Sequence, residues 1–142
     1  MKIEMDQTMP AASAAQIQQF HRKFGVLLPE DYIDFLIEYG GGTPIRTEFD
    51  DEPEFSIVEF YSLNLSEKRN LWNETQRSRQ QLDHQRKIPF AFLQGGNRLF
   101  FDVSNPQGVS KVYYWDHEDA DSEFHYVCDS FSEMVGRLNE EE

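Results

Sequence analysis

Residues 90–115 read FAFLQGGNRLFFDVSNPQGVSKVYYW and contain three short apolar and aromatic runs that are separated by two turn-forming segments. Glycine, asparagine and proline in the separating segments are typical of tight turns between strands. The pattern therefore predicts an antiparallel meander. Its expected strands are Phe90–Gln94, Arg98–Val103 and Val109–Trp115, joined by turns at 95–97 and 105–108.

The middle run indicates how this sheet is packed. Leu99, Phe101 and Val103 alternate with a second set of residues, Arg98, Phe100 and Asp102. Because successive side chains of a strand point to opposite faces, this alternation suits a sheet with one face packed against helices. Two further runs, Phe55–Phe60 and Phe124–Cys128, predict additional strands.

Capping residues and apolar periodicity predict four helices around these strands. A helix that begins near Ser13 carries its apolar stripe at Ile17, Phe20 and Phe24, and one that follows Pro29 ends at the glycines 40–42. The segment Ser66–Gln85 predicts a largely exposed, basic helix with Trp72 as its anchor. The last helix begins at Ser130, which forms an S-x-x-E capping box with Glu133.

These elements predict a single α+β domain with a mostly antiparallel sheet flanked by helices. The length of 142 residues suits one hydrophobic core. Residues 1–12 show no periodicity, so we expect a flexible N-terminal arm there and one domain over residues 13–142.

Composition restricts the function classes. The single cysteine, Cys128, excludes an intramolecular disulfide and favours a reducing compartment. The start of the chain has no secretory signal pattern and no run could span a bilayer, so we expect a cytoplasmic protein that does not bind membranes. A net charge of −13 and a pI near 4.6 argue against direct nucleic-acid binding and favour a basic protein partner.

The negative charge is concentrated in two segments, around residues 48–54 and 116–123, neither of which contains lysine or arginine. They are solvated runs that keep the protein soluble, or they are an acidic patch that attracts a basic partner and speeds its association. On the second interpretation the partner-binding residues are Glu48, Asp50, Asp51, Glu52, Tyr114, Glu118, Asp119, Asp121 and Glu123.

Catalytic and metal sites have weak support in the sequence. His117 and His125 flank the second acidic segment and could join Asp119 and Asp121 in a metal site, but the spacing matches no short metal motif. His21 and His84 are expected to be solvated, and Cys128 follows an apolar strand as a buried thiol does. We therefore expect no cofactor, no metal and no enzymatic activity.

Three segments in this order resemble the SUKH superfamily, which includes yeast cell-wall assembly regulators and many bacterial immunity proteins. They are Phe24–Tyr32 (FGVLLPEDY) with the following Phe35-Leu36 and glycines 40–42, Ile88–Asp102 with its Gly95-Gly96-Asn97 turn, and Val112–Glu118 (VYYWDHE) with the capped helix after Ser130. The resemblance spans roughly residues 16 to 138. The basic middle helix and the acidic 48–54 loop have no counterpart in the family pattern.

The resemblance implies a sheet flanked by helices and a role in binding proteins. In bacteria that role is commonly the neutralisation of a polymorphic toxin, often a nuclease, and no catalytic residue is carried over. The leading hypothesis is thus an immunity protein that binds a basic toxin domain through its acidic loops. The alternatives are a regulatory scaffold or adaptor that binds a cellular protein and a metal-dependent hydrolase built around His117 and His125.

Overall fold

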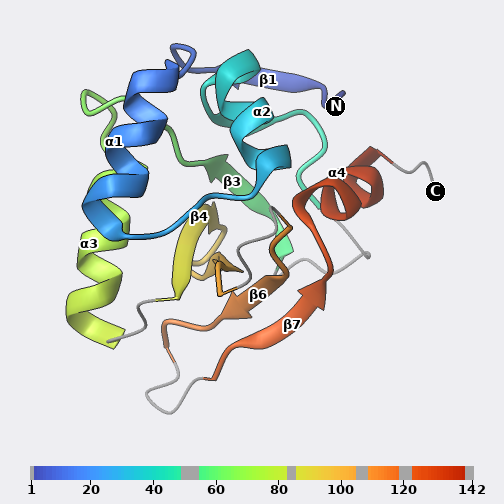
Figure 1. The fold of residues 1–142 in the computed structure, drawn as a ribbon. Helices are drawn as coiled ribbons and strands as arrows, with labels where there is room; N and C mark the ends of the chain where they lie inside the picture. Colours follow the sequence, from blue (N-terminus) through green and yellow to red (C-terminus); the bar gives the residue numbers. More distant parts are fainter. Residues whose placement is uncertain (1, 49–54, 83–85, 105–108, 119–122, 140–142) are drawn as a thin grey trace.

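The computed structural model describes residues 2–48, 55–82, 86–104, 109–118 and 123–139. In this part of the chain a seven-stranded antiparallel sheet runs in the order β1 to β7, so each strand pairs with its neighbours in the sequence (Figure 1). The strands are β1 (Met5–Thr8), β2 (Gly42–Pro44), β3 (Ile57–Phe60), β4 (Lys87–Leu93), β5 (Arg98–Asp102), β6 (Val112–Trp115) and β7 (His125–Cys128). The helices are α1 (Ala14–Phe24), α2 (Glu30–Tyr39), α3 (Leu71–Leu82) and α4 (Phe131–Asn139).

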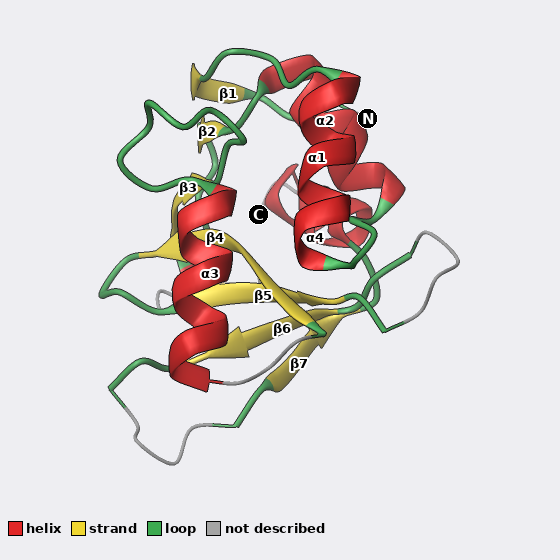
Figure 2. Ribbon diagram, turned by 60° about the vertical axis from the view of Figure 1, so that its left-hand side comes forward, coloured by secondary structure: helices red, strands yellow, loops and turns green. Residues whose placement is uncertain are grey.

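This architecture confirms the predicted α+β fold with an antiparallel sheet flanked by helices. The predicted meander is present as β4, β5 and β6, and β7 extends it. The neighbours of the helices in space differ from their order in the chain: α3 lies beside α1, and α4 lies beside α2 (Figures 1 and 2). None of the helices in the described ranges combines the length and apolar character that a bilayer crossing requires.

Tyr32 of α2 lies at the centre of the core. Its ring is fully buried and lies 4.9–5.6 Å, between centroids, from four phenylalanines on α2, β4, β5 and α4. Its hydroxyl donates to the carbonyl of Tyr61 at 2.7 Å and approaches that of Phe90 at 3.3 Å. One side chain therefore joins the helical layer to β4 and to the residue after β3. The four phenylalanines are Phe35, Phe90, Phe101 and Phe131.

The helix ends form as their sequences predict. Ser13 and Gln16 make a reciprocal capping box at the start of α1, and Gly25 ends this helix with a φ of 66°. At α4 the hydroxyl of Ser130 accepts from the backbone N–H of Glu133 at 3.0 Å. The Glu133 carboxylate accepts from the N–H of Asp129, one residue before the expected partner.

The N-terminal segment differs from the prediction of a flexible arm. Met5–Thr8 form β1, which pairs with β2, and Ile3 belongs to the core. A β-carbon at Gly42 would lie 2.1 Å from the carbonyl oxygen of Gln7, so this strand pair requires glycine there. The alternation of Ile3 and Met5 with Lys2, Glu4 and Asp6 is a strand signal that the prediction overlooked, whereas the three residues of β2 carry no such pattern.

The basic helix α3 is less exposed than its sequence suggests. Leu71, Glu74 and Thr75 are buried. Trp72 packs 5.4 Å from the ring of Phe20 and donates to the carbonyl of Leu63 at 2.9 Å. The prediction of a Trp72 anchor is confirmed, and the prediction of a largely exposed helix is wrong because α3 also buries a polar face.

The prediction that His21 is solvated is also wrong. Its ring is half-buried, and Nε2 accepts a hydrogen bond from the backbone N–H of Leu28 at 3.0 Å. Burial lowers the pKa of His21 from its ordinary value of 6.5, which agrees with an unprotonated Nε2. The neutral imidazole therefore fixes the loop between α1 and α2. His84 lies outside the described residues.

Replacing Tyr32 with phenylalanine tests the central hydrogen bond. Tyr32→Phe keeps the ring but leaves the buried carbonyl of Tyr61 without its 2.7 Å donor, so we expect the free energy of unfolding to fall by about 1–3 kcal/mol. Tyr61→Phe is the matched control, because the buried Tyr61 hydroxyl makes no hydrogen bond of good geometry with a described residue. Urea denaturation should show a lower free energy of unfolding for Tyr32→Phe and little or no change for Tyr61→Phe. If the two variants were equally stable, the Tyr32 hydroxyl would not stabilise the core as described.

His21 gives a pH dependence of stability. Burial disfavours the imidazolium in the folded protein, so the unfolded chain binds this proton more tightly. The stabilisation from neutral His21 is complete above about pH 6.5 and is lost as the pH falls through the lowered folded pKa. His21→Gln retains an acceptor but does not titrate. Between about pH 7.5 and about pH 5.5, the wild type should lose more stability than this variant; parallel losses would show that His21 does not contribute.

Candidate protein-binding surface

The two acidic segments begin and end at the same end of the sheet. Ile57 pairs with Leu93, which places the start of β3 beside the end of β4. Arg98 pairs with Trp115, so β6 ends where β5 begins, and the start of β7 lies alongside (Figure 2). The segments that enter this end are 45–56, the turn 94–97 and 116–124; we call their described residues the acidic end.

Each acidic segment contributes five acids. Residues 45–56 also hold one arginine, Arg46, whereas residues 116–124 hold no lysine or arginine. Of the predicted binding residues, the described part of the chain contains Glu48, Tyr114, Glu118 and Glu123, and it places all four at the acidic end. The three glutamates are exposed. The remaining candidates, Asp50, Asp51, Glu52, Asp119 and Asp121, lie outside the described residues.

The described end of the first segment is held by β6 and by the β4–β5 turn. Phe55, at the end of the first segment, packs edge-on against Tyr114 with 4.9 Å between ring centroids. The next residue, Ser56, accepts a hydrogen bond through its carbonyl from the N–H of Gln94 at 2.9 Å. The end of the first segment is thus fixed both to β6 and to the β4–β5 turn.

Asn97 holds the start of the second segment. Its Nδ2 donates to the hydroxyl of Tyr114 at 2.5 Å, and its Oδ1 accepts from the backbone N–H of His117 at 3.1 Å. The Nδ1 of His117 lies 2.7 Å from the same oxygen. The imidazole covers Gly96, where a β-carbon would lie 2.8 Å from the ring. Sequence reasoning identified the Gly95-Gly96-Asn97 turn but not this role; the signal was an asparagine at its last position.

The aromatic residues of β6 divide between the two faces of the sheet. Tyr114 is half-buried and packs against the core, with its hydroxyl held by Asn97. Tyr113 and Trp115 lie on the other face, where Trp115 and Phe124 contact the fully buried Phe100. Phe124 therefore anchors the end of the second acidic segment, and the half-buried Trp115 packs on the same phenylalanine.

The acidic end retains unneutralised charge. Among the described residues, neither Glu48 nor Glu118 has a cation within ion-pair distance. Arg69, near β3 and β4, already has an acidic partner. Its guanidinium binds Glu59 at 2.5 Å and lies 4.1 Å above the ring of Phe92. Because exposed carboxylates without partners set the local potential, this end attracts cations.

The described residues give no support to the metal-site alternative. They contain no group of three histidine, cysteine or acidic side chains placed to hold an ion. His117 is engaged by Asn97, and His125 is exposed beside the ring of Tyr114. The two aspartates of that hypothesis, Asp119 and Asp121, lie outside the described residues.

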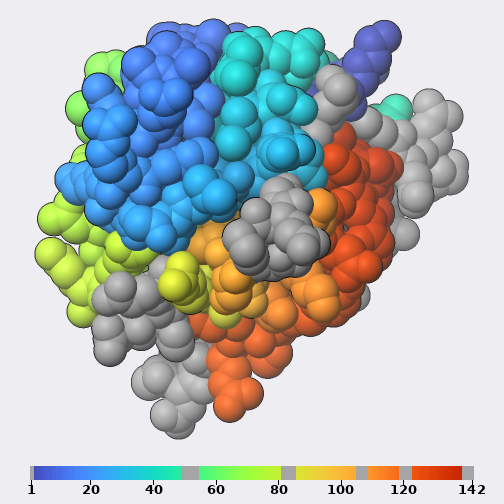
Figure 3. Space-filling view, in the orientation of Figure 1, coloured from blue at the N-terminus to red at the C-terminus, as the bar shows by residue number. Residues whose placement is uncertain are grey.

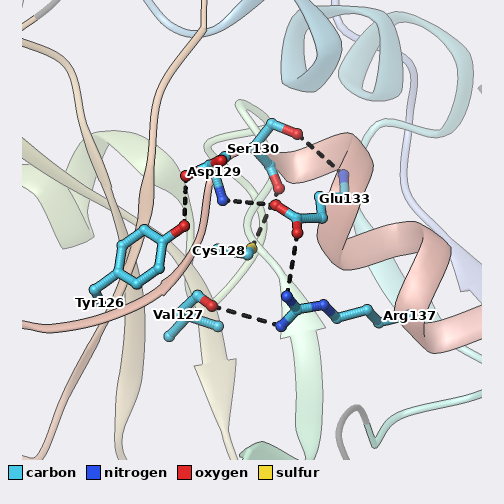
Figure 4. A network of polar contacts seen from close by, with 7 residues as sticks. All are labelled: Tyr126, Val127, Cys128, Asp129, Ser130, Glu133 and Arg137. Carbon is cyan, nitrogen blue, oxygen red and sulfur yellow. Dashed lines mark hydrogen bonds and ion pairs between the residues drawn. The ribbon is translucent and has the colours of Figure 1, made fainter.

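Cys128 has the structural role that its sequence context predicts. Its thiol is fully buried, and burial raises its pKa to about 11. It lies within the junction of β7 and α4, where Glu133 accepts from the Asp129 N–H at 2.8 Å and binds Arg137 at 3.1 Å (Figure 4). The hydroxyl of Tyr126 bonds the Asp129 carboxylate, which raises the pKa of Tyr126 to about 12. These contacts fix α4 to the sheet.

The sequence resembles proteins of one family over nearly its whole length. The family model described as SMI1 / KNR4 family (SUKH-1) matches residues 11–137. A curated relative, the SPbeta prophage-derived uncharacterized protein YokK of Bacillus subtilis (strain 168), is 27% identical over 148 residues, covering 89% of this chain and 74% of that protein. The family match spans α1 to α3, most of α4 and the strands β2 to β7, and β1 precedes it.

The match over residues 11–137 agrees with the observed fold and with the predicted resemblance. The chain belongs to the SMI1 / KNR4 (SUKH-1) family.

Proposed function

We propose that this protein is an immunity protein that binds the basic surface of a cognate toxin through its acidic end. The observation that carries the proposal is the convergence of two acidic segments, from different parts of the sequence, at one end of the sheet. Membership of the SUKH-1 family and a prophage-derived relative support this role. The protein acts by stoichiometric binding and uses no catalytic residue.

Electrostatic attraction explains how such a surface selects its partner. A toxin that acts on nucleic acid carries a basic face for the phosphate backbone. Ten acids in two adjoining segments complement that face and accelerate encounter, while the unlike charges fix the orientation of docking. Trp115 precedes the second acidic segment and is the candidate for an aromatic contact with the partner, as is typical of an interface.

Charge reversal at the described acids tests the binding surface. Glu48→Lys combined with Glu118→Lys should lower the association rate with the toxin encoded beside this gene about ten-fold at low salt, with a smaller effect on dissociation. Asp34→Lys with Glu38→Lys makes the same charge change on the exposed side of α2 and should have a much smaller effect. Stopped-flow measurements at about 50 mM and about 300 mM salt should show that the difference shrinks as salt rises.

The two pairs of variants also separate the proposal from its alternatives. If both pairs slow association equally, the acidic end has no special role and net charge alone matters. If the neighbouring gene product is not bound and cells gain no protection, the immunity role is rejected, and a cellular partner recovered with wild type but not with the acidic-end variant identifies an adaptor.

Asn97 provides a test that leaves the charge unchanged. Asn97→Ala removes the hydrogen bonds to Tyr114 and His117, so the second acidic segment loses its fixed start. We expect faster hydrogen exchange at residues 116–118 and about ten-fold weaker toxin binding, because the segment must then be ordered on binding. Asn64→Ala, in the loop after β3, is the control. Faster exchange without weaker binding would contradict the role of Asn97 in the interface.

A further inference from the structure

A groove lies at the opposite end of the sheet from the acidic end. It has a volume of 640 Å³ and runs between the end of α1 with its following loop and the residues that flank β4 and β5. Arg86 and Val103 lie side by side there, since the Val103 N–H donates to the Arg86 carbonyl at 2.8 Å. Figure 3 shows this face, with α1 and its loop in blue above the yellow and orange residues of β4 and β5.

Three apolar side chains line part of the groove, and the rest of its lining is Gly25 and polar or charged residues. Val26 and Val103 are buried, and Leu27 is 55% exposed at the rim. The loop that carries Val26 and Leu27 is held by the bond from the Leu28 N–H to His21, and Gly25 has no side chain to fill the space. The groove thus offers a preformed apolar surface.

Two arginines border this apolar surface. Arg22 and Arg86 are exposed, and neither has an ion-pair partner among the described residues. Both guanidinium groups can therefore reach an anionic group bound in this groove. Their position on both sides of one groove suggests that an anionic group completes the site.

The carbonyl groups of His21 and Phe24, at the C-terminal end of α1, have hydrogen-bond donors other than Arg22 and Arg86. The carbonyl of His21 accepts from the N–H groups of Gly25 and Val26 at 2.9 and 3.2 Å. Arg79 donates to the carbonyl of Phe24 at 2.8 Å and lies 5.0 Å from the ring of that residue. The pKa of Arg79 is lowered by burial and by the charge of Arg86, so the cations here repel one another. A bound carboxylate would relieve that repulsion.

We propose that this groove binds an extended segment of a partner protein in which an acidic side chain adjoins an apolar one. The carboxylate pairs with Arg22 and Arg86, and the apolar side chain lies against Val26, Leu27 and Val103. An open groove covers only one side of its occupant, so a small anion would gain few contacts there, whereas an extended chain makes contacts along its length. The arginine forks suit a carboxylate bound through both oxygens.

This binding mode is independent of the toxin-binding proposal, because the groove and the acidic end lie at opposite ends of the sheet. The basic groove selects acidic segments, and the acidic end selects basic surfaces. The protein can therefore hold two partners of opposite charge at the same time.

A peptide titration followed by NMR tests the groove. The probe is a short capped peptide that alternates glutamate and leucine, added to the uniformly 15N-labelled full chain. We expect saturable shifts at the amides of Gln18–Leu28, Arg86, Val103 and Ser104. Arg22→Gln with Arg86→Gln should weaken the peptide about ten-fold, since both charges are lost. Lys68→Gln with Lys111→Gln, which removes the same charge at other exposed positions, should leave the affinity within about two-fold.

Control peptides, a control variant and a phosphate titration show whether the peptide binds the groove specifically. Peptides with glutamine or lysine in place of glutamate should not saturate, and the acidic-end variant Glu48→Lys with Glu118→Lys should bind the probe at least as well as wild type. Equal shifts from inorganic phosphate at the same concentration would overturn the peptide assignment in favour of a free anion. Chemical-shift changes scattered over the surface, or an equal loss of peptide affinity in both double variants, would show that the groove is not the binding site. Thermal unfolding checks that each variant is folded.

Discussion

The buried hydroxyl of Tyr32 imposes the constraint around which the rest of the core is arranged. A phenol in an apolar interior is costly unless it is hydrogen-bonded. Here it donates to the Tyr61 carbonyl, beside the point where the N–H of Tyr61 binds Phe90. The position of α2 over the sheet is therefore fixed by a directional bond as well as by the surrounding phenylalanine rings. β4 is the first strand of the meander, and its pairing with β3 and β5 places the strand ends on which both candidate surfaces are built.

The antiparallel order of the sheet separates these surfaces. Connections between successive strands alternate between the two ends, and each acidic segment is such a connection on the same side. The first leads into β3 and the second joins β6 to β7. The groove arises at the other end, where Arg86 precedes β4 and Val103 follows β5. The topology thereby produces a molecule with an acidic end and a groove bordered by arginines at the opposite end.

Local chemistry explains which parts of this arrangement could be predicted from the sequence. The meander, the Ser13 cap and the helix after Ser130 depend on turn, capping and periodicity signals, which lie within a few residues of one another. The strand pair β1–β2 was not predicted, although Ile3 and Met5 alternate with polar residues, because Gly42–Pro44 has no strand pattern and the pairing joins residues far apart in the sequence. The acidic candidates were identifiable from charge, but the bonds from Asn97 to Tyr114 and His117 join residues far apart in the sequence and required the fold. Arg22 and Arg86 are also far apart in the sequence, and only the fold shows that they border one groove.

The central claim is that two acidic segments act as one binding surface, and a hydrogen-exchange footprint of the complex tests it most directly. Exchange would be compared for the free protein and for its complex with the toxin encoded beside this gene. The account predicts protection of both 45–56 and 116–124, together with the 94–97 turn, while the α1 end of the groove stays unchanged. Protection of only one segment, or of a face that includes neither, would contradict it.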